Sequence, residues 1–230
     1  MLSNIPVLFE DAYLLVLDKP TGLIVDNTES RNEAIKTVEN YLIEYRAKSG
    51  LTAPIDRSGI VHRLDKETSG VLLVAKDSDT LVALQDQFRG RLIDKEYKAV
   101  VSGEITQNSF SVDAPIGRNP RSKIKYCVIA GGRAAVTDFE KVKSVVIEDY
   151  PYTLLKVVPH TGRTHQIRVH LLAFGTPVAG DDIYQNIKAF TRDRKLFGRM
   201  MLHAEKIAFT HPKTGAKLSF EAKLPVVFDL

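Results

Sequence analysis

A succession of short strand-like runs in the second half of the chain limits the possible folds more than any other feature. From Glu96 onward, β-branched and aromatic residues gather in runs separated by turn signals such as Asn119-Pro120 and Gly131-Gly132. Strands that follow one another so closely favour antiparallel hairpins. The predicted strands cover residues 13–18, 97–101, 110–112, 123–129, 135–142 and 152–158, with a final hairpin around residues 211–215.

Helical patterns interrupt these strands. Residues 32–48 place apolar side chains at helical spacing, and Gly50 follows as a stop signal. A second helix is predicted to begin with Ser78 as its N-cap and to end at Gly90, and a third covers residues 164–174. Helices inserted among sequence-local strands predict an α+β fold with a mixed, mostly antiparallel central sheet.

The composition is that of one ordinary folded domain. With 230 residues, of which 44% are hydrophobic, the chain can bury a substantial core, and no linker-like segment divides it. We therefore expect a single domain over residues 1–230. Cys127 is the single cysteine, which excludes an internal disulfide. Apolar runs are too short for a membrane span and a signal-peptide pattern is absent, so we expect a cytoplasmic protein.

A dense polar segment within residues 58–77 is the strongest candidate for a catalytic loop. Ile60-Val61 precedes it and residues 71–74 follow it, so both ends are expected to be anchored in the core. Asp65 would then be presented on a rigid mount, which suits a nucleophile or an acid–base group. The same pattern also fits a solvated turn between two strands, so the residues alone leave both interpretations open.

Three histidines at spacings of five, His160, His165 and His170, raise the question of a zinc site. The spacing opposes it, because five residues turn a helix by about 140° and an odd offset alternates the faces of a strand. A loop running into a helix, with side chains and amides directed at phosphates, fits residues 159–170 better. Arg168 would then bind a carboxylate or a phosphate with two nitrogens.

Basic residues are clustered although the net charge is only +4. They gather at residues 118–125, 160–170 and 188–199. Each cluster alone reads as a solvated face. Three of them in one chain predict a basic groove that suits a polyanionic partner.

The order of several short elements resembles the RluA-type family of RNA pseudouridine synthases, which isomerise uridine in structured RNA. HRLDKETSGVLLVAKD at residues 62–77 resembles the family's most characteristic segment. The sequence KPTGL at 19–23 precedes it, and KEY at 95–97 and TGRTHQIRVHL at 161–171 follow. LHA at 202–204 and FTHP at 209–212 complete a match that spans nearly the whole chain, and the ordered set is more specific than any single piece.

The resemblance implies a pseudouridine synthase fold with a basic RNA-binding cleft, and a reaction without metal or cofactor. It implies that Asp65 is the essential residue, attacking the uracil ring or the ribose anomeric carbon or abstracting a ribose proton. Tyr97 matches the family tyrosine that stacks on the uracil and takes the proton from carbon 5. Arg168 matches the arginine that pairs with the aspartate, so we expect Arg168→Ala to lose activity while keeping its fold.

The resemblance also implies that the target uridine is flipped out of the RNA. Arg63 is expected to fill the vacated space, and His62 to contact RNA from the same loop. Ile167 and Leu202 are expected to pack against the base. Further RNA contacts are expected from Arg118, Arg121, Lys123, Arg163 and His165. The partner would be a stem-loop of ribosomal RNA, transfer RNA or both, bound by a monomer.

Two departures from the family pattern stand out. Asp26-Asn27 replaces the histidine and proline that often follow the KPxGL element. Because the catalytic elements begin by Lys19, we expect no separate N-terminal RNA-binding module, so that the catalytic domain itself or a partner recognises the target. Asp181 and Tyr184 match a family element near the site and are interpreted as structural.

Three other functions are compatible with parts of the sequence. A non-catalytic RNA-binding protein would be expected to have lost Asp65, which is present. A hydrolase that uses Ser69 would need the G-x-S-x-G turn, which the segment around Ser69 lacks. A metal-dependent nuclease would need a carboxylate cluster that the sequence pattern does not indicate, and it would be inhibited by EDTA.

Overall fold

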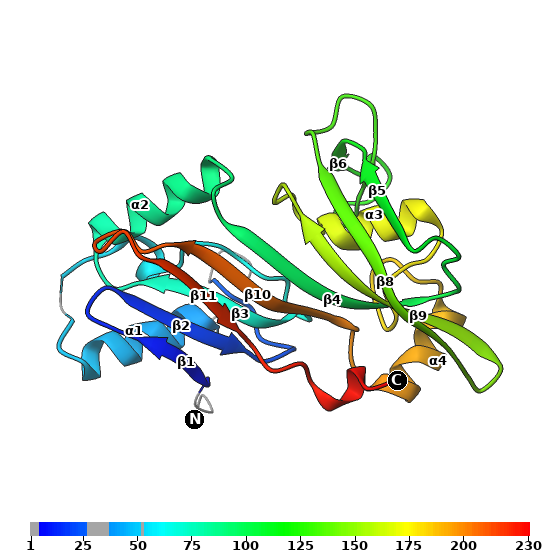
Figure 1. The fold of residues 1–230 in the computed structure, drawn as a ribbon, viewed down its shortest axis with the longest axis horizontal. Helices are drawn as coiled ribbons and strands as arrows, with labels where there is room; N and C mark the ends of the chain where they lie inside the picture. Colours follow the sequence, from blue (N-terminus) through cyan, green and yellow to red (C-terminus); the bar gives the residue numbers. More distant parts are fainter. Residues whose placement is uncertain (1–4, 27–36, 52) are drawn as a thin grey trace. The chain divides into compact units, whose positions relative to one another are not determined.

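The computed structural model describes residues 5–26, 37–51 and 53–230, and the chain divides into two compact units (Figure 1). The first unit comprises Met1–Asp94 and Ala204–Lys223, and the second comprises Lys95–His203 and Leu224–Leu230. Compact units are not by themselves independent domains, so the expectation of a single catalytic domain stays a prediction.

The strands of the first unit follow the order β1-β2-β3-β10, and β11 pairs with β10. Leu14, Leu15, Val16 and Leu17 of β2 are all fully buried, as in a strand covered on both faces. The predicted hairpin after β10 is confirmed, since the His211 amide donates to the Ala216 carbonyl at 2.8 Å. The strands are β1 (Val7–Glu10), β2 (Leu14–Lys19), β3 (Ser69–Ala75), β10 (Leu202–Thr210) and β11 (Lys217–Glu221).

Both helices of the first unit begin at a side-chain cap. Helix α1 (Val38–Lys48) is capped by Thr37, whose extended backbone shows that the helix starts later than the predicted range 32–48; residues 32–36 lie outside the described residues. Helix α2 (Ser78–Arg89) is capped by Asp77, which accepts from the Thr80 amide at 2.9 Å. The prediction of Ser78 as the cap was therefore wrong by one residue, because the carboxylate of Asp77 reaches the amide first. A short 3₁₀ turn, η1 (Asp56–Gly59), precedes the polar loop.

The strands of the second unit follow the order β4-β9-β8-β5, with β6 and β7 as a separate hairpin. They are β4 (Asp94–Ser102), β5 (Ser109–Asp113), β6 (Ile116–Arg118), β7 (Tyr126–Val128), β8 (Val136–Ile147) and β9 (Tyr150–Pro159). The strand predicted at 123–129 is shorter because the Asn119 amide donates to the Lys125 carbonyl and closes a loop there. The strand predicted at 135–142 continues to a tight turn at Glu148 and Asp149, which both have positive φ.

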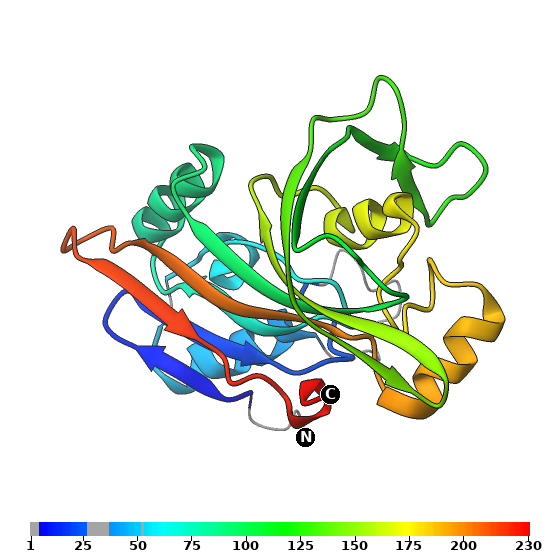
Figure 2. The same cartoon turned by 45° about the vertical axis from the view of Figure 1, so that its right-hand side comes forward.

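Two helices cover opposite faces of the β4-β9-β8-β5 sheet (Figure 2). Ala99 and Val101 of β4 share a core with helix α3 (Gln166–Phe174), whereas Val100 shares one with helix α4 (Ile187–Phe197). Neighbouring strand residues point to opposite faces, so a continuous apolar run supplies both cores. Helix α3 agrees with the helix predicted at 164–174, whereas α4 lies in a segment predicted to be a solvated basic face. The 3₁₀ turn η2 (Val226–Phe228) lies near the C-terminus.

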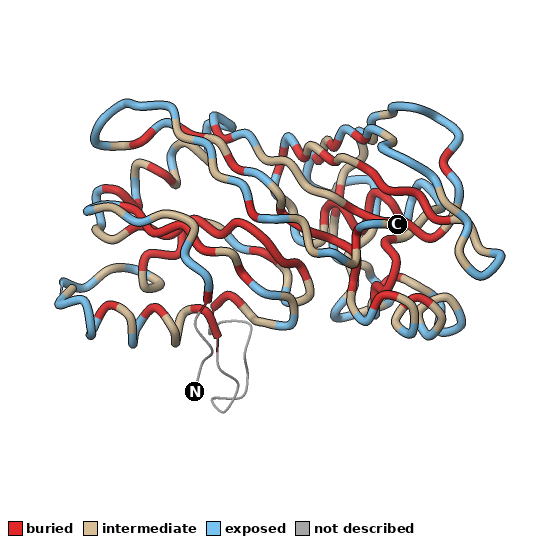
Figure 3. The backbone as a smooth tube through the Cα atoms, turned by 60° about the horizontal axis from the view of Figure 1, so that its bottom comes forward, coloured by how far each residue is buried: buried red, intermediate tan, exposed pale blue. Residues whose placement is uncertain are grey.

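Burial follows the strands of each unit, and exposed residues gather at the hairpin ends (Figure 3). The expected α+β class with a mixed, mostly antiparallel sheet is confirmed. In the described part of the chain, none of the helices has the length and apolar character needed to cross a membrane.

Candidate active site

The polar loop of the first unit is anchored at both ends. On one side Ile60 bridges to Val74, although Ile60-Val61 forms a single bridge rather than a full strand. On the other side β3 is buried along its whole length. Asp65 lies between these anchors, half-buried, at a turn closed by the Thr68 amide donating to the Asp65 carbonyl at 3.1 Å. The loop is thus a rigid mount for Asp65 rather than a solvated connection.

A buried lysine fastens this loop to the preceding turn. Lys19 is fully buried, and its Nζ donates to the carbonyls of Pro20 at 2.9 Å, Leu23 at 2.9 Å and Lys66 at 3.1 Å. A buried ammonium group is tolerated only when its protons are satisfied in this way. Because Lys66 follows Asp65 directly, the Lys19 side chain holds the backbone that carries the candidate catalytic group.

The rest of the KPTGL turn adds two bonds to the same loop. Thr21 donates its hydroxyl to the Glu67 carbonyl at 2.7 Å, and the Gly22 amide donates to the Lys66 carbonyl at 2.8 Å. Gly22 has a φ of +83°, which a residue with a side chain rarely adopts. The physical role of KPTGL within this unit is therefore to brace the Asp65 loop.

His62 is part of the mount. Its Nε2 accepts a hydrogen bond from the Leu73 amide at 3.0 Å, and its ring packs on Phe88 with centroids 4.9 Å apart. An imidazole nitrogen that accepts from a backbone amide carries no proton, so the neutral ring has its proton on Nδ1. The expected contact of His62 with RNA stays a prediction.

The departure at position 26 places a buried carboxylate beside two arginines. Asp26 is fully buried, forms an ion pair with Arg57, and lies 3.7 Å from the Nη1 of Arg63. The Arg63 side chain is 41% exposed, which leaves it accessible for the expected entry into RNA. Asn27 lies outside the described residues.

The second unit holds the other expected catalytic residues. Tyr97 on β4 packs against the apolar cluster that contains Ile167 and Leu202, which are 6% and 3% exposed. This cluster is suited to receive a planar base. Lys95, two residues before Tyr97, has its pKa lowered by burial, a property that its sequence context did not reveal.

Arg168 is held by the carboxylate of Asp181, the residue interpreted from the sequence as structural. Its Nε and Nη2 donate to Asp181 Oδ2 and Oδ1, both at 2.7 Å, and the two side chains are 3% and 0% exposed. Asp181 also accepts from the amides of Ile183 and Tyr184 at 2.9 and 3.0 Å. A bidentate buried pair of this kind fixes the plane of the guanidinium. Asp65 belongs to the first unit, so its pairing with Arg168 stays a prediction.

The three histidines that raised the question of zinc each have different hydrogen-bond partners within the second unit. His160 contacts Asp138 at 2.6 Å, and His165 Nδ1 lies 2.9 Å from the Tyr184 hydroxyl. His170 is fully buried against the Thr137 hydroxyl at 2.9 Å and the Ala114 carbonyl at 3.1 Å. Among the described residues, no group of three histidine, cysteine or acidic side chains is arranged to hold a metal ion.

The residues expected to contact RNA lie mostly on exposed loops of the second unit. Arg118, Arg121 and Lys123 are exposed on the β6-β7 hairpin. Arg163 is half-buried and donates from Nε to the Ala134 carbonyl at 3.0 Å. His165 stands at the N-cap position of α3 without a side-chain capping bond, and its φ of 56° is left-handed. Such a backbone is costly for a residue other than glycine, and strained residues of this kind cluster at functional sites.

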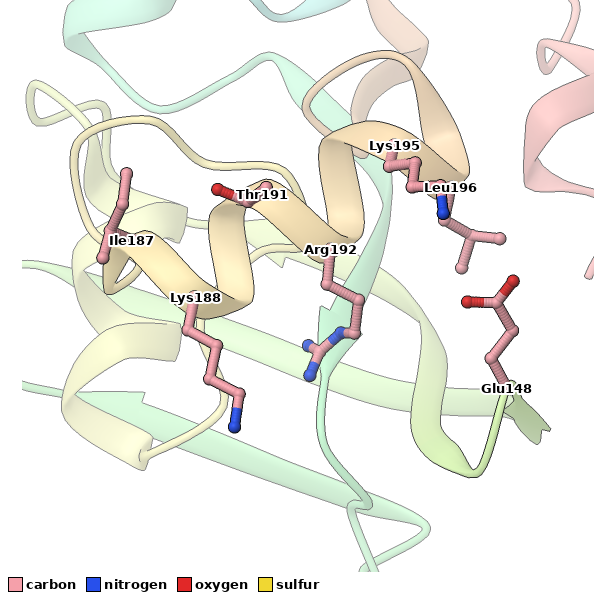
Figure 4. A pocket seen from close by; sticks show the side chains of 7 residues that line it. All are labelled: Glu148, Ile187, Lys188, Thr191, Arg192, Lys195 and Leu196. Atoms are coloured by element: carbon pink, nitrogen blue, oxygen red, sulfur yellow. The ribbon is translucent and has the colours of Figure 1, made fainter.

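An open cavity of about 640 Å³ runs along α4, where the third basic cluster lies (Figure 4). Its lining residues are Glu148, Ile187, Lys188, Thr191, Arg192, Lys195 and Leu196. Arg192 is oriented by Asp193 at 2.8 Å and by the Tyr152 hydroxyl at 2.9 Å. Lys188 and Lys195 are exposed, so this face presents positive charge near a cavity.

Comparisons with known proteins agree over most of the chain. A family model described as RNA pseudouridylate synthase matches residues 13–173. An uncharacterized RNA pseudouridine synthase of Aquifex aeolicus is 37% identical, with 98% of this chain and 72% of that protein covered. The ribosomal large subunit pseudouridine synthase D of Pseudomonas aeruginosa is 35% identical, with 98% of this chain and 70% of that protein covered. The solved structure of human RNA pseudouridylate synthase domain containing 1 matches with a TM-score of 0.78 at 26% identity. The match covers 96% of this chain and 84% of the human one.

Proposed function

Because this chain belongs to the RNA pseudouridylate synthase family, whose members are isomerases acting on RNA, we propose that Asp65 is its essential catalytic residue. The observation that carries this proposal is the bracing of the Asp65 loop. A fully buried lysine and the KPTGL turn hold the backbone next to a half-buried carboxylate. Catalytic groups need such support, because misplacement by about 1 Å can cost a factor of 10² in rate.

The reaction rearranges one nucleotide without adding or removing atoms. The bond from ribose to uracil N1 breaks, the base turns, and the anomeric carbon joins uracil C5. The C5 hydrogen leaves as a proton, and N1 takes up a proton from water, so the atoms balance. Asp65 starts this sequence by attacking the ring or the anomeric carbon, or by removing a ribose proton. Tyr97 stacks on the base and receives the C5 proton, while Ile167 and Leu202 pack beneath it. Arg168 pairs with Asp65 and favours its ionised form.

The substrate we propose is a uridine in structured RNA that is flipped out of its stack. Arg63 enters the vacated space, and the exposed cations of the β6-β7 hairpin hold phosphates. Relatives named ribosomal large subunit pseudouridine synthase D suggest ribosomal RNA, and the family resemblance adds transfer RNA. We place this activity in the cytoplasm, where both RNAs are found.

Tritium release from RNA labelled at uracil C5 tests the proposal. Joining ribose to C5 expels the label into water, so a mixed pool of unmodified RNA serves as substrate. We expect release by the parent protein and none by Asp65→Asn, which keeps the shape of the side chain but not its charge. A parent protein that binds the pool without releasing tritium would instead support the RNA-binding alternative. Loss of release in EDTA would favour a metal-dependent reaction.

A further inference from the structure

The hydroxyl of Tyr184 joins two segments that are far apart in sequence. It accepts a hydrogen bond from the Tyr126 amide at 3.0 Å and lies 2.9 Å from His165 Nδ1. Either the Tyr184 hydroxyl or His165 Nδ1 is the donor of this second bond, according to the tautomer of the imidazole. Both neighbouring rings meet edge to face, with centroids 5.8 Å apart for Tyr126 and His165 and 5.6 Å for His165 and Tyr184. One phenol thus ties β7 to the start of α3.

The other parts of Tyr184 contact the buried ion pair. Its ring lies under the Arg168 guanidinium at 5.1 Å, and its amide donates to Asp181 at 3.0 Å. Tyr184 itself is only 6% exposed. Removal of the hydroxyl alone would leave the ring and the amide in place. The hydroxyl and the ring therefore have separable roles.

The β6-β7 hairpin, which Tyr184 contacts through Tyr126, is short and strongly basic. Strands β6 and β7 form a separate two-stranded sheet, and Ile116 of β6 also exchanges two backbone hydrogen bonds of 2.9 Å with Arg133. A two-stranded sheet is marginal unless it packs on something else, and here Ile116 packs in one cluster with Val169 and Tyr184. Arg118 pairs with Tyr126 across the hairpin, lies over its ring at 5.2 Å and donates to the Lys123 carbonyl at 3.1 Å. A shift of Tyr126 would therefore move Arg118 and, through it, the loop that carries Lys123.

We propose that Tyr184 is a positioning residue whose hydroxyl fixes the β6-β7 hairpin for RNA binding. This inference rests on the proposed function, since it takes RNA as the ligand of the hairpin. Tyr184 acts through Tyr126 and His165 and takes no part in the chemistry. Its hydroxyl sets RNA affinity, whereas its ring and amide support Arg168 and hence turnover.

A double-mutant cycle on RNA affinity tests this role. The variants are Tyr184→Phe, the hairpin triple variant Arg118→Ala/Arg121→Ala/Lys123→Ala, and their combination. Fluorescence anisotropy with an unmodified ribosomal RNA transcript measures Kd at one fixed salt concentration. Loss of the two hydroxyl bonds is expected to weaken binding by about tenfold. Tyr184→Phe should add no further loss to the triple variant, because the cations that it positions are already absent.

Turnover and a matched control separate positioning from general damage. Tyr184→Phe should raise KM by about the same factor as Kd and leave kcat within about twofold of the parent. Tyr45→Phe removes a tyrosine hydroxyl that bonds to Glu10 in the first unit and should change neither constant. Hydrogen exchange at the Tyr126 amide should become faster in both variants that carry Tyr184→Phe, and should stay unchanged in Tyr45→Phe.

Distinct results refute distinct claims. Parent-like affinity of Tyr184→Phe, or an equal loss in the triple-variant background, overturns the positioning role of the hydroxyl. A fall in kcat without a change in Kd also overturns it. One further outcome is that the double-mutant cycle shows the expected coupling in Kd while the parent protein releases no tritium. In that case the proposed isomerase activity is refuted, and the role of the Tyr184 hydroxyl in positioning the hairpin is retained.

Discussion

At the scale of single residues, the buried pair of Arg168 and Asp181 changes an expectation from the sequence. The two side chains are 3% and 0% exposed and share two hydrogen bonds of 2.7 Å. Removing one partner from a buried pair leaves an uncompensated charge. An alanine at position 168 therefore affects stability as well as activity, whereas the sequence alone suggested loss of activity in an intact fold.

We predict that Arg168→Ala lowers the free energy of unfolding by about 3–5 kcal/mol. Arg168→Lys should be less destabilised, because it keeps the charge, yet should lose most of its turnover with the bidentate geometry. Asp182→Ala is the control: Asp182 is 53% exposed and 3.6 Å from Arg168, so its removal should cost less than about 1 kcal/mol. Urea denaturation measures the free energy of unfolding of all three variants, and kcat measures the turnover of Arg168→Lys. An Arg168→Ala protein as stable as the parent would contradict the prediction.

His170 is a second residue whose environment should affect the stability of the protein, through its lowered pKa. Its pKa is lowered from 6.5, chiefly by burial, although the Ala114 carbonyl and Asp113 act in the opposite direction. The neutral ring accepts from the Thr137 hydroxyl and donates to the Ala114 carbonyl, so a second ring proton at Nδ1 would require the Thr137 hydroxyl to turn and accept instead of donate.

We predict a loss of stability below neutral pH that depends on His170. Below pH 6.5 the unfolded chain binds a proton at this histidine that the folded chain does not. The free energy of unfolding therefore decreases as the pH is lowered. The fall ends at the folded-state pKa. Urea denaturation at pH 7.5 and pH 5 should show a smaller decrease for His170→Gln than for the parent. Equal decreases in both proteins would exclude this histidine as the source.

At the scale of elements, the start of β3 depends on one close backbone approach. Gly70 has a φ of +114°, and a Cβ there would lie 2.1 Å from the Ala204 carbonyl oxygen of β10. The strand begins there because glycine lets the two backbones meet. Since β3 directly follows the Asp65 loop, this packing also fixes one end of the candidate site.

We predict that Gly70→Ala costs at least about 3 kcal/mol of unfolding free energy, from overpacking and an unfavourable φ together. Gly215→Ala provides the control: its φ is +72° but nothing lies within 4 Å of the added Cβ. It should cost only about 1–2 kcal/mol, from backbone strain alone. Thermal or urea unfolding of both variants measures the difference. Equal losses would mean that the contact with Ala204 yields easily.

Other elements differ in how well local sequence specified them. Helix α2 was found to within one residue, because a side-chain cap, an apolar face and a final glycine all lie in one stretch of chain. Helix α4 was missed although Asn186 caps it and Gly198 ends it. Its basic residues masked the apolar positions, and Phe197 shows its role only through the contact with Tyr152.

At the scale of the whole molecule, the net charge of +4 understates the positive charge available to RNA. Basic residues are concentrated on the β6-β7 hairpin, near α3 and along α4. Each cation that neutralises a phosphate releases a counterion, so affinity falls with salt in proportion to the number of contacts.

Lys188 and Lys195 are exposed on α4, and we expect both to contact phosphates. We predict that Lys188→Ala/Lys195→Ala reduces the slope of log K against log salt by about 2. Lys48→Ala/Lys217→Ala removes the same charge outside the three basic clusters and should leave the slope unchanged. Anisotropy with an unmodified transcript at several salt concentrations gives both slopes. Equal slopes for both double variants would remove α4 from the RNA-binding surface.

The sequence by itself determined the α+β class, most of the alternation of strands and helices, and the ordered elements that identify the family. It offered the anchored loop around Asp65 as one of two interpretations. These features depend on neighbouring residues, because spacing, caps and turn residues act within a few positions. Tertiary structure alone decided which groups hold the site residues. Lys19 meets Lys66 across 47 positions, and Tyr184 meets Tyr126 across 58. Such contacts depend on how distant strands and helices pack, and no local pattern encodes them.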